Sequence, residues 1–300
     1  MRAAVISDGR IEVEERPDPV PGPDEVLIRV RAAGVNGADL AQRAGRYPPP
    51  PGVTDVPGLE CAGETEDGER VMALLPGGGQ AELAVAHRSH VLRVPEQLSW
   101  EEAGGFVETF ATAHDALFAQ AELREGDRLL VNGAAGGVGT AAVQLGRAAG
   151  AQVTANARHH HDELRALGAR TDVEGDYDVI LELVGGENLA ANLGRLARNG
   201  RIVVIGVGAG SRAELDYGHL MFKRARISGS TLRSRSTAEK EDVIRRLEAF
   251  MQAHAFRVPV DETFPLSRAQ DAYERFAAGG KFGKIVITTT PGRDRSTPQA

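Results

Sequence analysis

A glycine-rich segment, NGAAGGVGTAA at 132–142, lies between an apolar run at 129–131 and an alanine-rich stretch with helical spacing. The predicted order is therefore strand, turn, helix. Glycines let the backbone come close to a pyrophosphate, and a helix N-terminus offers unpaired N–H groups and a partial positive charge. We therefore expect a dinucleotide here, contacted by Ala135, Gly136, Gly137 and Val138. Because Ala134 replaces the first glycine of the common motif, a turn that serves only packing remains the alternative.

The end of the next predicted strand indicates which dinucleotide is bound. An NAD site places a carboxylate there for the ribose hydroxyls, whereas NADP needs a cation for its 2′-phosphate. This strand ends in NARH at 156–159, and no acid follows before Asp162. Arg158 suits a bidentate phosphate contact and His159 adds a donor, so NADPH is the expected cofactor. A solvated basic turn is the alternative, and the consecutive histidines 159–161 would splay apart rather than converge on a metal.

A later strand ends in the glycine-rich run VIGVGAG at 204–210. In a doubly wound sheet, ligands lie over the carboxyl ends of the strands. Gly206, Val207 and Gly208 are therefore candidates for contacts at the nicotinamide end, with a flexible loop as the alternative.

The chain falls into two regions with different patterns of predicted secondary structure, and these elements position the candidate residues. The first hundred residues are β-rich, with candidate strands at 25–30, 70–75 and 82–86. From about 110 to 245, predicted strands at 128–132, 152–157, 178–183, 201–205 and 226–230 alternate with helical segments at 140–149, 162–167 and 189–196. This alternation predicts an α/β fold with a doubly wound parallel sheet. The final elements, 238–254, 269–278 and 283–288, look more like part of the first domain than a third one. The predicted domains are 1–108 with 250–290, and 109–249, followed by a loose tail at 291–300.

Composition narrows the function classes. The chain has 42 acidic and 35 basic residues, a formal net charge of −7, which argues against a dedicated nucleic-acid binder. It has no run of 18 apolar residues and no recognisable leader, so we expect neither a membrane span nor secretion, and the cytoplasm is the default location. The single cysteine, Cys61, excludes intrachain disulfides and cysteine-based metal cages.

Several further motifs resemble the medium-chain dehydrogenase/reductase superfamily, and within it the zinc-independent, NADPH-dependent quinone oxidoreductases, especially the p53-inducible group. The motifs that carry the resemblance lie at 34–40, 43–52, 57–60, 73–81, 132–142, 232–235 and 283–286. It extends over nearly all of 1–290 and implies a GroES-like β-rich catalytic domain beside a Rossmann domain. It also implies cofactor contacts by Thr112, Val184, Leu232 and Lys281.

The same resemblance argues against a metal. In zinc-dependent alcohol dehydrogenases of this superfamily, two cysteines and a histidine hold the catalytic zinc, and the matching positions here are Asn36, Leu59 and Glu108. Leucine cannot ligate zinc, and the remaining oxygen donors do not make the usual site. Without a Lewis acid, alcohol oxidation is poorly supported. Quinones accept hydride readily, so positioning and hydrogen bonds could suffice for them.

On the substrate side, Asn36 and Tyr47 are the catalytic candidates. Asn36 could hydrogen-bond the cofactor ribose or a substrate carbonyl, and Tyr47 could stack on a quinone or donate its hydroxyl. Both could equally be structural, and we expect Asp39 and Arg43 to form a structural pair on one helix. Glu108 is either a proton-supplying acid with a raised pKa or a group tied by hydrogen bonds.

The leading hypothesis is an NADPH-dependent quinone reductase with a small-molecule acceptor. One alternative is reduction of activated alkenes such as enones or enoyl thioesters, and another is a non-catalytic nucleotide- or RNA-binding role, which the net charge disfavours. By analogy we expect a homodimer, because 226–230 would be an edge strand that needs pairing or covering.

Overall fold

The structure, a computed structural model, describes residues 1–289 and divides into two compact units. Among the described residues, unit 1 comprises Met1–Glu108, Ser236–Ile244 and 257–289, and unit 2 comprises Thr109–Arg235 and Arg245–Phe256. The predicted boundary, at which the chain returns to the first domain at 250, differs from this division. The helix Thr237–Ala253 contributes its first part to unit 1 and its remainder to unit 2, and the chain then re-enters unit 1 at Arg257. The predicted loose tail, 291–300, lies outside the described residues.

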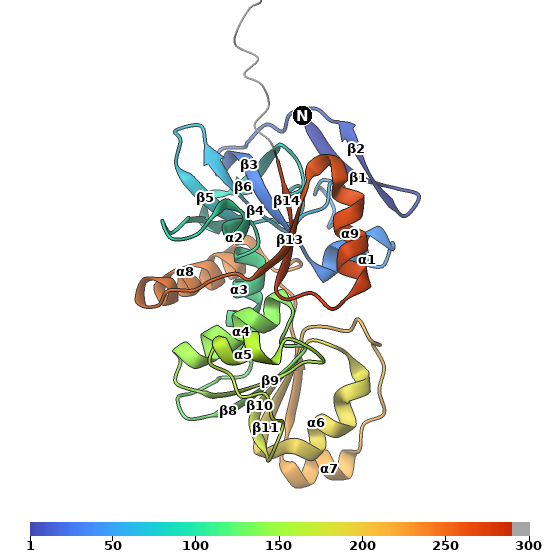
Figure 1. Ribbon diagram of the computed structural model, residues 1–300, viewed down its shortest axis with the longest axis vertical. Coiled ribbons are helices and arrows are strands. Elements are labelled where there is room, and N and C mark those ends of the chain that lie inside the picture. The colour runs from blue at the N-terminus through green and yellow to red at the C-terminus, as the bar shows by residue number, and fades with distance from the viewer. Residues whose placement is uncertain (290–300) are drawn as a thin grey trace, which may run out of the picture. The chain divides into compact units, whose positions relative to one another are not determined.

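Unit 1 is built on a seven-stranded sheet in the order β13-β14-β3-β4-β5-β7, with β6 also paired to β3, and on a separate β1-β2 hairpin (Figure 1). Its strands are β1 (Arg2–Ser7), β2 (Arg10–Glu15), β3 (Glu25–Val35), β4 (Glu60–Thr65), β5 (Arg70–Leu74), β6 (Leu83–His87), β7 (Val91–Arg93), β13 (Val260–Pro265) and β14 (Lys284–Thr288). Its helices are α1 (Gly37–Arg43), η1 (Arg88–His90), α2 (Trp100–Gly104), η4 (Leu266–Arg268) and α9 (Ala269–Ala278). The long strand β3 pairs with β14, β4 and β6, and so brings residues from both ends of the chain together.

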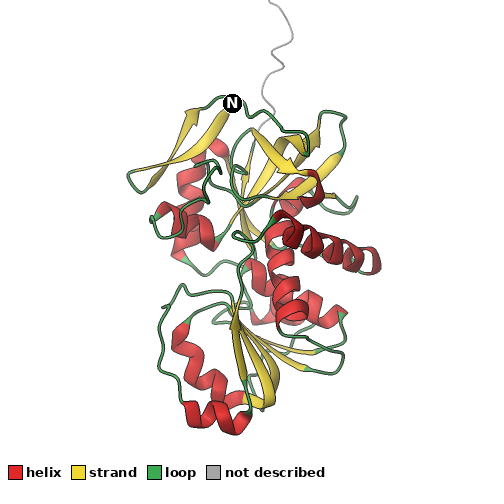
Figure 2. Cartoon of the chain, turned by 180° about the vertical axis from the view of Figure 1, so that it is seen from behind, coloured by secondary structure: helices red, strands yellow, loops and turns green. Residues whose placement is uncertain are grey.

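Unit 2 has a five-stranded sheet in the order β12-β11-β10-β8-β9, in which every neighbouring pair is parallel. Its strands are β8 (Arg128–Asn132), β9 (Gln152–Asn156), β10 (Tyr177–Glu182), β11 (Leu196–Val204) and β12 (Arg226–Gly229). The helices are η2 (Asp115–Gln120), α4 (Gly137–Ala148), α5 (His161–Ala166), η3 (Gly186–Asn188), α6 (Leu189–Arg195) and α7 (Tyr217–Lys223). Helices cover both faces of this sheet (Figure 2). The predicted α/β fold, with a doubly wound parallel sheet beside a β-rich domain, is confirmed.

Two helices join the units along the chain, α3 (Val107–His114) and α8 (Thr237–Ala253). A π-helix, η2, follows α3 directly, and the sequence pattern did not predict it. Strand β11 begins at Leu196 rather than at 201, because a register shift against β10 admits Asn199 with a positive φ of 65°. Within residues 1–289, no helix combines the length and apolar character needed to cross a membrane.

Candidate functional site

The turn between β8 and α4 has the geometry of a pyrophosphate cradle. Gly133 has a φ of 78°, which favours glycine, and a Cβ added at Gly139 would lie 2.5 Å from the Gly133 carbonyl oxygen. The N-cap residue of α4, Gly136, has no side chain to bond the first N–H groups of the helix. These N–H groups are available to an anion, so the chain's own residues fit a dinucleotide phosphate at this turn.

The end of β9 fixes the other side of the turn. The Asn156 carbonyl accepts hydrogen bonds from the Gly133 and Ala134 N–H groups at 3.0 and 3.1 Å. Its side chain is an amide, not a carboxylate, and it donates to Asn132 Oδ1 at 2.8 Å. Beyond it, Arg158 and His159 are both exposed, and the Arg158 guanidinium makes no hydrogen bond or ion pair to any described residue. A cation without a partner at this strand end suits a 2′-phosphate.

A buried carboxylate network that sequence reasoning missed lies at the carboxyl ends of three adjacent strands. Parallel pairing sets Asn132 beside both Asn156 and Glu182. The Glu182 carboxylate, 3% exposed, accepts hydrogen bonds from the Asn132 and Asn192 side chains, both at 2.8 Å. It also accepts from the Val184 and Gly185 N–H groups at 2.7 and 2.9 Å. Within residues 1–289 this carboxylate is held by hydrogen bonds and by no ion pair, and these bonds fix the loop that starts at Val184.

The loop after β11 packs against that same segment. A Cβ at Gly206 would overlap the Leu183 carbonyl, so only glycine allows this approach. The Ala209 N–H donates to the Val184 carbonyl at 2.9 Å, and Val207 between them is 52% exposed. The predicted residues Val184, Gly206, Val207 and Gly208 are thus brought together in unit 2.

Thr112, Leu232 and Lys281, the remaining candidates for cofactor contacts, lie outside the glycine turn and the loop after β11. Thr112 lies on α3 and is half-buried, and Leu232 is buried in the segment after β12. Lys281 belongs to unit 1, where its ammonium donates to the Gly283 carbonyl at 3.0 Å and lies over the Phe276 ring. Burial and the charge of Lys284 lower the pKa of Lys281 to about 8.

Unit 1 contains a buried ionic cluster at the junction of β4, β14 and α1. Lys284 Nζ donates to Glu60 Oε1 at 2.6 Å and to Asn36 Oδ1 at 2.7 Å. Asn36 Nδ2 in turn donates to Glu60 Oε1 at 2.9 Å. Glu60 Oε2 accepts the backbone N–H of Glu108 at 3.0 Å. The amide of Asn36 is therefore engaged with both partners, which gives it a positioning role.

A second buried acid lies beside this cluster. Asp39, 0% exposed, accepts the N–H groups of Asn36 and Gly58 at 2.8 and 3.1 Å and the Gln80 side chain at 3.4 Å. Burial is the main cause that raises the pKa of Asp39 to about 6. The pair that the sequence predicts between Asp39 and Arg43 does not form among the described residues, because Arg43 lies over the Tyr273 ring instead.

The carboxyl of Glu108, unlike those of Glu60 and Asp39, accepts no hydrogen bond from a described residue. Glu108 is the second residue of α3, and its half-buried carboxyl makes no hydrogen bond to any residue in the described range. Burial, followed by the charge of Glu60, raises the pKa of Glu108 to about 8. A carboxyl in this condition is largely protonated at neutral pH and can donate a proton. The other catalytic candidate, Tyr47, is half-buried in the loop after α1.

The cluster does not fit a catalytic zinc ion. The three matching positions carry Asn36, Leu59 and Glu108, and the Lys284 ammonium is already bound to Asn36 and Glu60. A cation among these oxygen donors would have to displace a buried ammonium and would gain neither a thiolate nor an imidazole. No group of three or more His, Cys, Asp or Glu residues suited to a metal occurs within residues 1–289.

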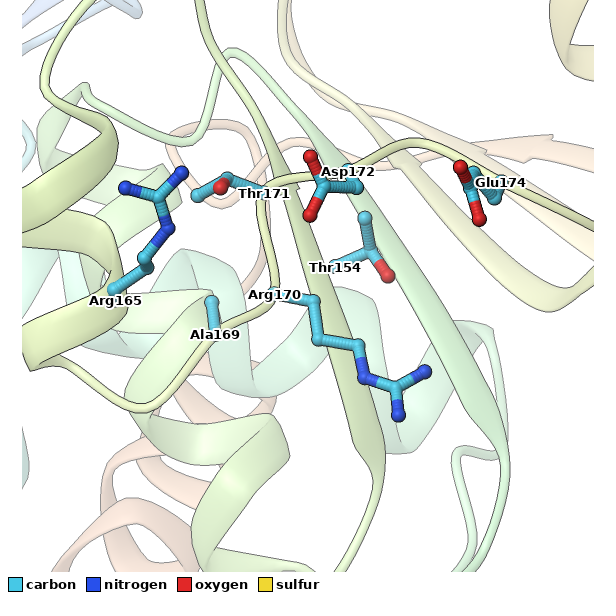
Figure 3. A pocket seen from close by; sticks show the side chains of 7 residues that line it. All are labelled: Thr154, Arg165, Ala169, Arg170, Thr171, Asp172 and Glu174. Atoms are coloured by element: carbon cyan, nitrogen blue, oxygen red, sulfur yellow. The ribbon is translucent and has the colours of Figure 1, made fainter.

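A hollow of about 420 Å³ lies beside the edge strand of unit 2 (Figure 3). Thr154 on β9 and Arg165 on α5 line it together with residues 169–172 and Glu174. Its arginines are balanced by acidic side chains, and none of the predicted cofactor or catalytic residues lines it. The chemistry of the nucleotide turn and of the ionic cluster lies elsewhere.

Comparisons with known proteins confirm the predicted fold class, a GroES-like unit and a Rossmann unit. Residues 22–96 match the family described as alcohol dehydrogenase GroES-like domain, and residues 149–287 match the one described as zinc-binding dehydrogenase. A quinone oxidoreductase of Lama guanicoe is 32% identical over 299 residues, with 90% of each chain covered. The quinone oxidoreductase of Thermus thermophilus, also solved with NADPH, matches with a TM-score of 0.85 and 32% identity over 96% of this chain and 100% of that one. CurK enoyl reductase matches with a TM-score of 0.82 and 25% identity over 96% and 99%.

Proposed function

This chain belongs to the medium-chain dehydrogenase/reductase superfamily, and we propose on that premise that it transfers reducing equivalents from NADPH to quinones without zinc. The observation that carries the proposal is the buried Lys284–Glu60 pair, which engages Asn36, one of the positions that match zinc ligands in zinc-dependent relatives. A site of this kind offers no Lewis acid, and quinones are acceptors that need none.

The preference for NADPH rests on two features of β9 and the loop after it. The strand ends in Asn156, whose amide is used by Asn132, so no carboxylate is present for an NAD ribose. Arg158 follows as an unpaired cation within the described chain. A guanidinium can bind a phosphate monoester through two parallel hydrogen bonds.

The chain's own residues would bind and orient the acceptor. When bound, NADPH supplies a hydride. Asn36 is locked between Lys284 and Glu60, so it would shape the site rather than supply a free donor. Tyr47 combines an aromatic face with a hydroxyl, which suits stacking on a quinone ring and donation to its oxygen.

The direct test is oxidation of NADPH by the purified full chain in the presence of benzoquinone and naphthoquinone, with NADH run in parallel. We expect acceptor-dependent loss of NADPH absorbance and a lower kcat/KM with NADH. A rate no higher than that of the protein-free mixture, with every quinone, contradicts the proposal.

Reduction of activated alkenes is the second candidate, favoured by the similarity to CurK enoyl reductase. In that reaction Tyr47 would protonate an enolate, which is more basic than a reduced quinone. A comparison of naphthoquinone with an enoyl thioester at matched concentrations separates the two functions. Tyr47→Phe is expected to slow the alkene reaction more than the quinone reaction if alkenes are the true acceptors.

We also propose a homodimer formed through unit 2. Strand β12 is an edge strand, and Ile227 on it is 37% exposed. The preceding helix α7 exposes three large apolar side chains, Tyr217, Met221 and Phe222, each by more than half. An unpaired edge beside exposed apolar groups is commonly covered by a second subunit. Sedimentation velocity should give twice the monomer mass, and Met221→Glu should shift it toward the monomer.

A further inference from the structure

We infer that Glu108 is the acid that protonates the reduced acceptor, and that Glu60, paired with Lys284, holds the backbone from which its side chain projects. The inference rests on the proposed function and names a group for its proton step. It follows from how three carboxyl groups share their cations in unit 1.

The charges of Glu60 and Lys284 balance each other within the buried cluster. Glu60 receives a hydrogen bond from the Lys284 ammonium at 2.6 Å and a further one from Asn36. Its second oxygen accepts the Glu108 N–H at 3.0 Å, which fixes the backbone from which the Glu108 side chain projects. The Glu60 charge is therefore fully compensated, and Lys284 is committed to Glu60 and Asn36 rather than to another carboxylate.

Charged groups on four neighbouring elements face Glu108. Glu60 on β4 and Asp39 on α1 disfavour its ionised form, while Lys284 on β14 and Lys240 on α8 favour it. Burial outweighs these charges and, with Glu60, raises the pKa of Glu108 to about 8. The carboxyl is half-buried and bonded to no described residue, so its proton is free to move to a bound molecule.

The proton step balances simply. The acceptor quinone gains two electrons and one hydrogen nucleus as hydride from NADPH, which leaves one quinone oxygen anionic. The O–H bond of Glu108 then breaks, and its proton forms the second O–H bond of the hydroquinone. The Glu108 carboxylate is then reprotonated by a solvated proton, so the sum is one NADPH, one quinone and one proton giving NADP⁺ and hydroquinone.

An infrared titration of the unliganded protein tests the protonation state without any turnover. The C=O band of a neutral carboxyl should persist at about pH 7 and disappear around pH 8 in the wild type, and it should be absent from Glu108→Gln. Glu101→Gln, on α2 and outside the cluster, should keep the band. A Glu108 that is ionised at about pH 7 overturns the inference.

Turnover then tests the role. Glu108→Gln should lower kcat for naphthoquinone by roughly 10²-fold, with the Kd for NADPH changed less than about twofold. Wild-type kcat should fall above about pH 8, a profile that needs no variant and survives if the substituted protein fails to fold. If the wild type reacts with quinones and Glu108→Gln reacts equally fast, the inference is overturned but the proposed function is not. The same holds if the wild-type kcat stays constant to about pH 9. A wild type inactive with every acceptor contradicts the proposed function instead.

Discussion

The Lys284 ammonium lies 2.6 Å from Glu60 Oε1, and the two side chains are only 2% and 0% exposed. The residues are 224 positions apart in the chain, and β4 and β14 both pair with β3, which brings them together. Removal of one buried charge leaves the other uncompensated. We therefore predict that Lys284→Met lowers the free energy of unfolding by about 3–5 kcal/mol in urea titrations.

Two controls make that measurement specific. Lys284→Met combined with Glu60→Gln should recover much of the loss, because no uncompensated charge remains. Arg93→Met removes a surface pair with Glu69 whose arginine is 82% exposed, and should cost less than about 1 kcal/mol. If Lys284→Met and Arg93→Met lower the free energy of unfolding by the same amount, the buried pair stabilises the fold no more than a surface pair does.

Arg158 should decide between the two nicotinamide cofactors. A charged hydrogen bond to phosphate is worth about 1.5–3 kcal/mol, so Arg158→Ala should raise the Kd for NADPH by roughly 10- to 150-fold. The Kd for NADH should change less than about threefold, since NADH has no 2′-phosphate. Arg165→Ala on α5, whose guanidinium pairs with Asp162, is the matched control. Equal loss of both cofactors would mean that Arg158 does not bind the 2′-phosphate.

Gly139 tests the packing of the nucleotide turn. An alanine Cβ there would lie 2.5 Å from the Gly133 carbonyl and 2.6 Å from Ala134 Cα, so the turn must move away from α4. We predict that Gly139→Ala weakens NADPH binding by at least about tenfold, measured by fluorescence titration, and lowers the melting temperature. Gly194→Ala on α6, where a Cβ meets nothing within 4 Å, should leave binding unchanged. Normal NADPH affinity in Gly139→Ala would refute the assigned geometry of the turn.

Asp39 should make stability depend on pH in an unusual direction. Burial raises its pKa from 3.8 to about 6, so between these values the folded chain holds a proton that the unfolded chain has released. This group's contribution to stability is therefore greatest below about pH 4 and decreases, by up to about 3 kcal/mol, as the pH rises to about 6. Asp39→Asn is less stable throughout, because its amide meets N–H donors, but it should lack this slope. Parallel pH profiles for the two proteins would contradict the assignment.

Local pattern was sufficient for the parallel sheet of unit 2, whereas the GroES-like fold of unit 1 was expected from the family resemblance. The glycine turn, the strand before it and the helix after it were predicted because each signal lies within about twenty residues of the next. Strand β9 was predicted to end at 157 and ends at Asn156, which leaves Arg158 in the loop as expected. The early start of β11 was missed because its first residues pair across an irregular register that no alternation of apolar residues reveals.

The polar networks could not be read from spacing. Glu182 is 50 residues from Asn132 and meets it only because parallel strands align their carboxyl ends. A usable signal was present, since three adjacent predicted strands end in or near Asn132, Asn156 and Glu182. Glu60 and Lys284 offered no such hint, because their contact depends on β3 pairing with two strands from distant parts of the chain.

The most direct test of a metal-free reductase is naphthoquinone-dependent oxidation of NADPH after exhaustive dialysis against a chelator, with zinc content measured in the same sample. We predict unchanged kcat and kcat/KM in protein that carries far less than one zinc per chain. Activity that disappears with the chelator and returns with added zinc would contradict it.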